Sequence, residues 1–105
     1  MKYRSRFLKS AQKDLHDVVD YISQHSFEAA QGFLDELDKR ILQICDFPKS
    51  CEACRTAPVL RRMVVGHYLV FYEEDEKNDV INIYRILHSS RNIEKNNLTG
   101  EKTEE

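Results

Sequence analysis

The chain has little of what marks disordered, fibrous or membrane proteins. Its 105 residues include three glycines and two prolines, with 41% hydrophobic and 32% charged residues. This composition is typical of an ordinary soluble globular protein. The longest uncharged apolar run, Met63 to Tyr72, is far too short to span a membrane. A chain of this length closes a single core, so we expect one domain over residues 1–95 and a polar, flexible tail over residues 96–105.

Cysteine is scarce, and the three thiols, Cys45, Cys51 and Cys54, are odd in number. An odd count argues against a closed disulfide framework and fits a reducing compartment. The N-terminus has basic residues but lacks the apolar segment and the small-residue cleavage site of a secretion signal. Together these features predict a cytoplasmic protein with no membrane association.

The chain has no excess of positive charge, since its 16 Lys and Arg residues face 18 Asp and Glu residues. Residues 94–105 hold four of the acids and two of the lysines, so residues 1–93 carry equal numbers of each sign. Proteins that bind nucleic acids normally show a strong basic excess. A nucleic-acid role would therefore have to rest on a local patch.

Common catalytic and cofactor motifs are also absent from the sequence. There is no glycine-rich phosphate loop, no GxSxG, no HExxH and no pair of carboxylates flanking a pocket motif. Cys51-Glu-Ala-Cys54 is a single CxxC, for which half a zinc site and a redox pair are both weakly supported. Structural zinc needs four ligands, and a thioredoxin-like pair sits at a strand-to-helix junction. We expect incidental thiols, no metal and no cofactor.

Hydrophobic periodicity predicts one strand followed by two helices in the first half of the chain. Alternating residues predict a strand over Lys2–Leu8. Ser10 and Ser26 are candidate N-caps of two amphipathic helices, the first ending near Gln24. The second helix stops at Phe47-Pro48, because proline has no amide to donate. Helices joined so tightly pack as an antiparallel hairpin.

The second half predicts a polar loop over residues 49–58 and then a meander of three strands. The strands are Val59–Val65, Tyr68–Glu73, which we expect to be central, and Val80–Leu87, with a tight turn at Gly66 and an acidic turn over 73–79. A short helix or turn from Ser89 to Lys95 would follow. The β-α-α-β-β-β order predicts an α+β fold with both helices on one face of an antiparallel sheet.

A compact polar group stands at the end of the last predicted strand, where Tyr84, Arg85, His88 and Arg91 fall within eight residues. Such a group is suited to bind an anionic ligand or another protein. Alternation along the strand puts Arg85 on the face of Ile83 and Leu87, and His88 on the face of Tyr84 and Ile86. A break in extended structure near His88 would instead bring its imidazole towards the two arginines.

Each member of this group also has a structural interpretation. Arg61 and Arg62 point to opposite faces, so at most one can join Arg85 to clamp a phosphate. The arginines are equally suited to pair with acids of the second helix or of the 73–76 run. His88 suits general acid–base chemistry or a hydrogen bond that caps the strand end. Tyr84 suits a half-buried sheet position better than a catalytic one.

The order of short motifs resembles the RelE/ParE superfamily of bacterial type II toxin–antitoxin toxins, especially its ParE-like, plasmid-stabilisation branch. The match covers residues 1 to about 95, and no single motif carries it. The matching motifs are Asp14-Leu15, Tyr21-Ile22, Phe47-Pro48, Leu60-Arg61-Arg62, Val65-Gly66-His67-Tyr68-Leu69-Val70-Phe71-Tyr72 and Arg85-Ile86-Leu87-His88-Ser89-Ser90-Arg91. The resemblance implies the β-α-α-β-β-β fold and a cognate antitoxin that wraps around the toxin.

The resemblance leaves the cellular target open. ParE-like toxins poison DNA gyrase. This branch is favoured by the RILHSSR ending and by the absence of a lysine-rich run and of a C-terminal tyrosine. Residues expected at the target or antitoxin surface are Arg61, Tyr84, Arg85, His88 and Arg91. RelE-like toxins cleave mRNA on the ribosome, in which case Arg61 or Arg62 and Arg85 would bind phosphates while His88 moves a proton. A degenerate, non-toxic member that only binds an antitoxin is the third possibility.

Overall fold

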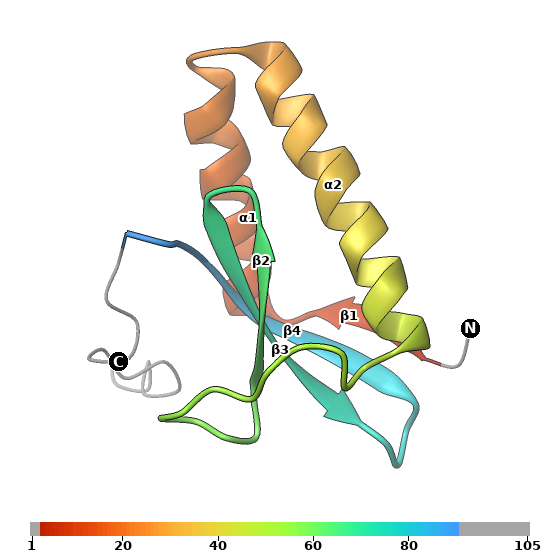
Figure 1. The fold of residues 1–105 in the computed structure, drawn as a ribbon. Coiled ribbons are helices and arrows are strands. Elements are labelled where there is room, and N and C mark those ends of the chain that lie inside the picture. The colour runs from red at the N-terminus through yellow and green to blue at the C-terminus, as the bar shows by residue number, and fades with distance from the viewer. Residues whose placement is uncertain (1–2, 91–105) are drawn as a thin grey trace.

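The computed structural model describes residues 3–90 and shows two helices packed on one face of a four-stranded sheet (Figure 1). The elements are β1 (Arg4–Phe7), α1 (Lys9–Ser23), α2 (Phe27–Asp46), β2 (Arg61–Val65), β3 (Tyr68–Asp75) and β4 (Val80–His88). The predicted α+β class and the β-α-α-β-β-β order are therefore confirmed. None of the helices described is long and apolar enough to cross a membrane.

The sheet has the strand order β1-β4-β3-β2. β2, β3 and β4 form the predicted antiparallel meander, with β3 and β4 in the centre. β1, however, runs parallel to β4, with Arg4 opposite Val80 and Phe7 opposite Ile83. The expectation of a purely antiparallel sheet is wrong for this one pairing. Alternation within a strand reports which face is buried but not the direction of a distant partner.

Only one of the two predicted helix caps is present. Ser26 caps α2, and its Oγ accepts a hydrogen bond from the amide of Ala29 at 3.1 Å. α1 instead begins at Lys9, and its N-cap, Leu8, has no side-chain bond. Ser10 lies inside the first turn, where its hydroxyl donates to the carbonyl of Tyr84 at 2.9 Å. The hydroxyl predicted to cap α1 therefore binds the backbone of β4 instead.

The turn predicted at Gly66 is confirmed. Val65 pairs with Tyr68, so Gly66 and His67 form a two-residue hairpin loop. Gly66 has φ +60°, a conformation that residues with a Cβ adopt only with strain. β2 begins at Arg61 rather than Val59, because residues 58–60 form a turn before it.

The core consists of two clusters on opposite faces of the sheet. The larger lies under the helices and includes Ile81, Ile83 and Ile86. The smaller contains Cys54, Leu60, Phe71 and Leu87, with Tyr84 packed against it.

A bulge breaks the simple alternation along β4. Phe71 pairs with Arg85 but Tyr72 pairs with Ile83, so Tyr84 is the extra residue. Ile83 and Ile86 consequently share the helix-facing side. The predicted grouping of Ile83 with Leu87, and of Tyr84 with Ile86, is wrong for this reason.

Some expectations concern the end of the chain. Ser89 and Ser90 form a turn after β4. Arg91, the rest of the helix or turn expected up to Lys95, and the predicted tail over residues 96–105 lie outside the described residues.

Candidate functional site

The predicted polar group at the end of β4 does not form one site. The carboxylate of Asp14 on α1 binds Arg85, with distances of 2.6 Å from Oδ2 to Nε and 3.2 Å from Oδ1 to Nη2. The side chains of Arg85 and Asp14 are 24% and 14% exposed. Arg85 therefore serves first as a link between α1 and β4.

The same contacts close the outer edge of β4. β1 covers this edge only as far as Ile83. Beyond it, Ser10 donates to the carbonyl of Tyr84, and Asp14 accepts from the amide of Ile86 at 3.0 Å. Two side chains one helical turn apart thus satisfy the backbone groups that an additional strand would otherwise bind.

Arg61 also makes internal contacts. Its Nε donates to Oε1 of Glu74 at 2.9 Å, and its Nη1 donates to the carbonyl of Cys51 at 2.7 Å. This is the predicted pairing with the 73–76 acids. Arg62, rather than Arg61, shares a row with Arg85, but Phe71 of β3 lies between them in that row. The two guanidiniums therefore start from strands about two spacings, or about 10 Å, apart.

Tyr84 is half-buried, as expected of a sheet residue. Its hydroxyl donates to Oε1 of Glu73 at 3.4 Å. Burial raises the pKa of Tyr84, and the charge of Glu73 raises it further. A phenol in this setting stays protonated at neutral pH and supports the sheet.

His88 is exposed at the end of β4. Its Nδ1 accepts a hydrogen bond from the amide of Ser90 at 3.0 Å and lies 2.8 Å from the Ser90 hydroxyl. Because an amide can only donate, the neutral ring carries its proton on Nε2. This confirms the predicted hydrogen-bonded cap at the strand end, and it orients the imidazole.

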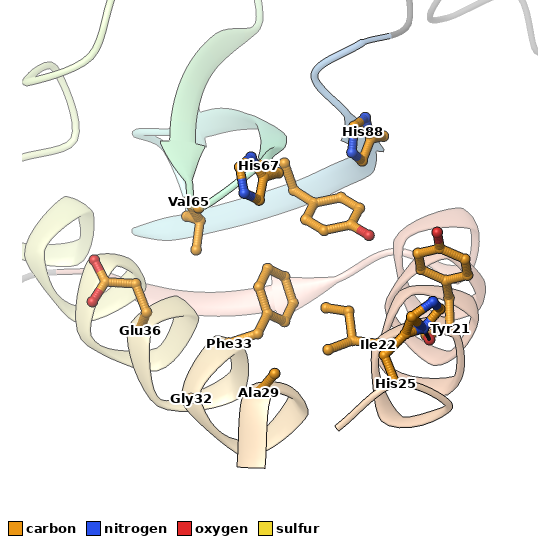
Figure 2. A pocket seen from close by; sticks show the side chains of 12 residues that line it. Tyr21, Ile22, His25, Ala29, Gly32, Phe33, Glu36, Val65, His67 and His88 are labelled. Carbon is orange, nitrogen blue, oxygen red and sulfur yellow. Dashed lines mark hydrogen bonds between the residues drawn. The ribbon is translucent and has the colours of Figure 1, made fainter. Parts of the chain in front are cut away.

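A cleft of about 440 Å³ lies beside His88, and we call it the hairpin cleft. It opens between the end of α1, the start of α2 and the β2–β3 turn (Figure 2). Its lining residues are mostly apolar or aromatic: Tyr21, Ile22, His25, Ala29, Gly32, Phe33, Glu36, Val65, Gly66, His67, Tyr68 and His88. Phe33 packs edge-on against Tyr68 in this lining, with ring centroids 5.3 Å apart.

Two imidazoles meet at the rim of the hairpin cleft. The rings of His67 and His88 are stacked, with centroids 6.3 Å apart and planes inclined by 16°. Tyr68 contacts His88 edge-on, with centroids 5.1 Å apart. His25 faces them from the helical hairpin beside Tyr21 (Figure 2). His67 and His25 are distant from His88 in the sequence, and the structure brings both to the cleft that His88 lines.

A second hollow, of about 430 Å³, adjoins the cleft, and we call it the acidic recess. It is lined by Asp14, Asp17, Val18, Tyr21, Tyr68, Ile86, Leu87, His88 and Ser90. Tyr21, Tyr68 and His88 line both hollows, so the cleft and the recess are neighbours. Among residues 3–90, no lysine or arginine lines either one. Burial raises the pKa of Tyr68, with a contribution from Tyr21.

The predicted CxxC is divided between the two core clusters. Cys54 is buried in the smaller cluster, whereas Cys51 packs against the larger one. All three cysteines are free. Within the described part of the chain, no three His, Cys, Asp or Glu side chains are arranged to hold a metal ion.

The sequence matches a known family model along most of its length. Residues 6–93 match the model described as the ParE toxin of the type II toxin–antitoxin system parDE. The chain belongs to the ParE toxin family. The predicted RelE/ParE-like membership is therefore confirmed. No curated protein matches this ParE family member.

Solved structures with similar folds include two toxin–antitoxin systems. One is the chromosomal ParDE system from P. aeruginosa, at 14% identity and a TM-score of 0.66, covering 83% of this chain and 96% of that one. Another is the RelBE2 complex from Mycobacterium tuberculosis, at 22% identity and a TM-score of 0.56, covering 84% of this chain and 99% of that one. These likenesses support the fold of this ParE family member.

Most of the hairpin cleft escaped sequence reasoning, although a signal for it was present. Tyr21 lies in the last turn of α1, His25 follows in the turn between the helices, and Tyr21 is 58% exposed. Ala29 and Gly32 place two small residues beside Phe33 on the adjoining turn of α2. Small residues leave room beside a larger neighbour, but only the packed hairpin shows that the β2–β3 turn completes a cleft there.

Proposed function

We propose that this ParE family member is a toxin that inhibits DNA gyrase by protein–protein contact, and that a cognate antitoxin neutralises it by binding in the hairpin cleft. It would act in the cytoplasm, whose reducing conditions suit its three free thiols. We propose His88 as a direct contact, since it is exposed at the cleft. Arg61, Tyr84 and Arg85 would support the surface from the strands, and Arg91 remains a predicted contact.

The observation that carries this proposal is the charge of the cleft and recess. Within residues 3–90 their lining contains Glu36, Asp14 and Asp17 but no lysine or arginine. Arg61 and Arg85 are both bound to carboxylates inside the protein. An RNA backbone needs cations to offset its phosphates. An apolar cleft with an acidic border is better suited to a protein segment.

The shape of the cleft supports a helical or extended antitoxin segment. Tyr21, Phe33 and Tyr68 give it aromatic walls, and Gly32 leaves open space, because beyond its own turn of helix nothing lies within 4 Å of where a Cβ would be. Aromatic side chains in a pocket commonly supply most of the binding energy of an interface. A hollow of this size has room for at least one large apolar side chain of the partner.

Gyrase inhibition is tested by adding the purified chain to a DNA supercoiling reaction with bacterial gyrase. Supercoiling should fall with toxin concentration and recover when the product of the adjacent reading frame is added. Induced expression in bacteria should produce filaments and a DNA-damage response. Arrested translation with intact DNA metabolism would reject the proposal. Harmless overexpression would identify a non-toxic, antitoxin-binding member instead.

Antitoxin binding at the cleft is tested by comparing Tyr21→Asp with Leu42→Asp. Both side chains are large, apolar and more than half exposed, but Leu42 lies outside the cleft. The product of the adjacent reading frame should bind the wild type and Leu42→Asp alike and should bind Tyr21→Asp far more weakly. Saturating binding should also raise the melting temperature, since a ligand at 100 times its Kd stabilises by about 2.7 kcal/mol.

The stacked pair of His67 and His88 favours a second candidate, a ribosome-dependent mRNA endonuclease. Two exposed imidazoles 6.3 Å apart are spaced for one to accept the 2′-hydroxyl proton and the other to protonate the leaving oxygen. Arg61 or Arg62, together with Arg85, would then bind phosphates. Cleavage of a message in programmed ribosomes, abolished by His88→Ala or His67→Ala, would establish this activity. We expect no such cleavage.

A further inference from the structure

The carboxylates of Asp14 and Asp17 line the acidic recess, and Asp14 is engaged in hydrogen bonds within the protein. Asp14 accepts hydrogen bonds from Nε and Nη2 of Arg85 and from the amide of Ile86. Asp17 is 62% exposed and pairs at 3.2 Å with Lys13, which is itself 79% exposed. Exposed pairs of this kind are weak, because water and salt screen them. Asp17 can therefore exchange Lys13 for a cation supplied by a partner.

Asp17 is placed to act together with the hairpin cleft. Asp17 and Tyr21 are four residues apart on α1 and so lie on the same side of the helix, one turn from each other. Tyr21 lines the cleft and the recess, as does Tyr68. A segment that inserts an apolar side chain over Tyr68 and continues past Tyr21 comes to Asp17 next.

We propose that the antitoxin segment bound in the hairpin cleft carries a lysine or arginine that pairs with Asp17, about one helical turn from its apolar anchor. This ion pair determines which antitoxin the toxin accepts. The inference rests on the antitoxin binding proposed above and adds the chemistry of the bound segment. Charged pairs at an interface select partners because a like charge in the same place repels.

The first test measures the affinity of the adjacent reading frame's product for charge variants of the full chain. Asp17→Lys should weaken binding by about tenfold or more, and Asp17→Asn by less. Asp20→Lys is the matched control, because Asp20 is exposed on the same helix but lines neither hollow. It should stay within about twofold of the wild type. Added salt should narrow the difference in binding affinity between Asp17→Lys and the wild type.

A charge exchange gives the decisive result. Each lysine and arginine of the partner's toxin-binding segment is changed to glutamate in turn. One of these changes should weaken binding to the wild type and restore binding to Asp17→Lys. If none of these changes restores binding to Asp17→Lys, the inference is overturned.

The outcomes separate this inference from the function on which it rests. If Tyr21→Asp impairs binding and Asp17→Lys does not, the cleft is used and the ion pair alone is rejected. If the partner does not bind the wild type, antitoxin binding itself fails. If the free chain sediments as a dimer and Tyr21→Asp makes it monomeric, a second copy occupies the cleft and the inference is overturned.

Discussion

The carboxylate of Asp14 clamps the guanidinium of Arg85 across a sequence separation of 71 residues, at 2.6 and 3.2 Å. The same carboxylate accepts a hydrogen bond from the amide of Ile86. α1 is thereby fastened to the outer edge of β4 just beyond the point where β1 ends. This ion pair explains why Arg85, a prominent arginine of the last strand, has a structural role within the fold itself.

Removing this link should destabilise the protein. Asp14→Ala removes the carboxylate to which the Ile86 amide and the largely buried Arg85 donate, so we expect a loss of about 2–3 kcal/mol in the free energy of unfolding. Urea denaturation monitored by circular dichroism measures it. Asp20→Ala, on the exposed side of the same helix, should change stability by less than about 0.5 kcal/mol. An Asp14→Ala protein as stable as the wild type would contradict the role given to the clamp.

Gly32→Ala should stabilise the chain and weaken antitoxin binding at the same time. Gly32 lies within α2, and an added Cβ would meet no atom within 4 Å, so alanine should add about 0.5–1 kcal/mol. The new methyl group projects into the hairpin cleft, where it would compete with a bound segment. Chemical denaturation and calorimetric titration measure the two effects. Asp38→Ala, outside the cleft on the same helix, should leave affinity unchanged, and undiminished affinity in Gly32→Ala would argue against occupation of the cleft.

Gly66→Ala should have the opposite effect on stability. Its φ of +60° is costly for a residue with a Cβ, although the site has open space around it. We expect a loss of about 1 kcal/mol from backbone strain alone. Thermal and urea unfolding compared with Gly32→Ala check this, since the chemical change is the same and the expected sign differs. A neutral result would mean that the turn relaxes at little cost.

The β3–β4 turn should lose stability in acid. A hydrogen bond from the Asn78 side chain lowers the pKa of Asp75 below its ordinary value of 3.8. A carboxyl with a lowered folded-state pKa stabilises the fold above its ordinary pKa, and this contribution disappears as the pH falls through the lowered value.

Asn78→Ala should therefore reduce stability at neutral pH and have less effect as the pH falls through the lowered pKa of Asp75, because the carboxyl then becomes protonated in both variants. Urea unfolding of both variants across this range checks the sign. An effect of Asn78→Ala that is constant with pH would show that the turn does not depend on the Asp75 charge.

Much of the fold was predictable because it depends on local patterns. The helical periods around Val18 and Leu37, the Ser26 cap and the Gly66 turn each reflect the physics of a few neighbouring residues. The parallel pairing of β1 was not predictable in this way, since it depends on a strand over 70 residues away. The bulge at Tyr84 was hidden as well, because alternation assumes an uninterrupted ladder.

The candidate site was predictable only at His88. Sequence proximity left open that Arg85 and His88 act together, but the bulge places Arg85 opposite Phe71, and Asp14 of α1 binds its guanidinium. His67, Tyr21 and Phe33 come from three other elements, and nothing in their own neighbourhoods marks them as a group. Their assembly follows from how the helical hairpin packs over the β2–β3 turn.

The sequence by itself determined the helices, the meander and membership of the ParE toxin family, because periodicity, caps, turns and ordered motifs are properties of nearby residues. Only the tertiary structure decided which arginines are bound inside the protein and which imidazoles face the hairpin cleft. The physical reason is that ion pairs and clefts are formed by contacts between residues far apart in the chain. Such contacts exist only once the helices have packed on the sheet.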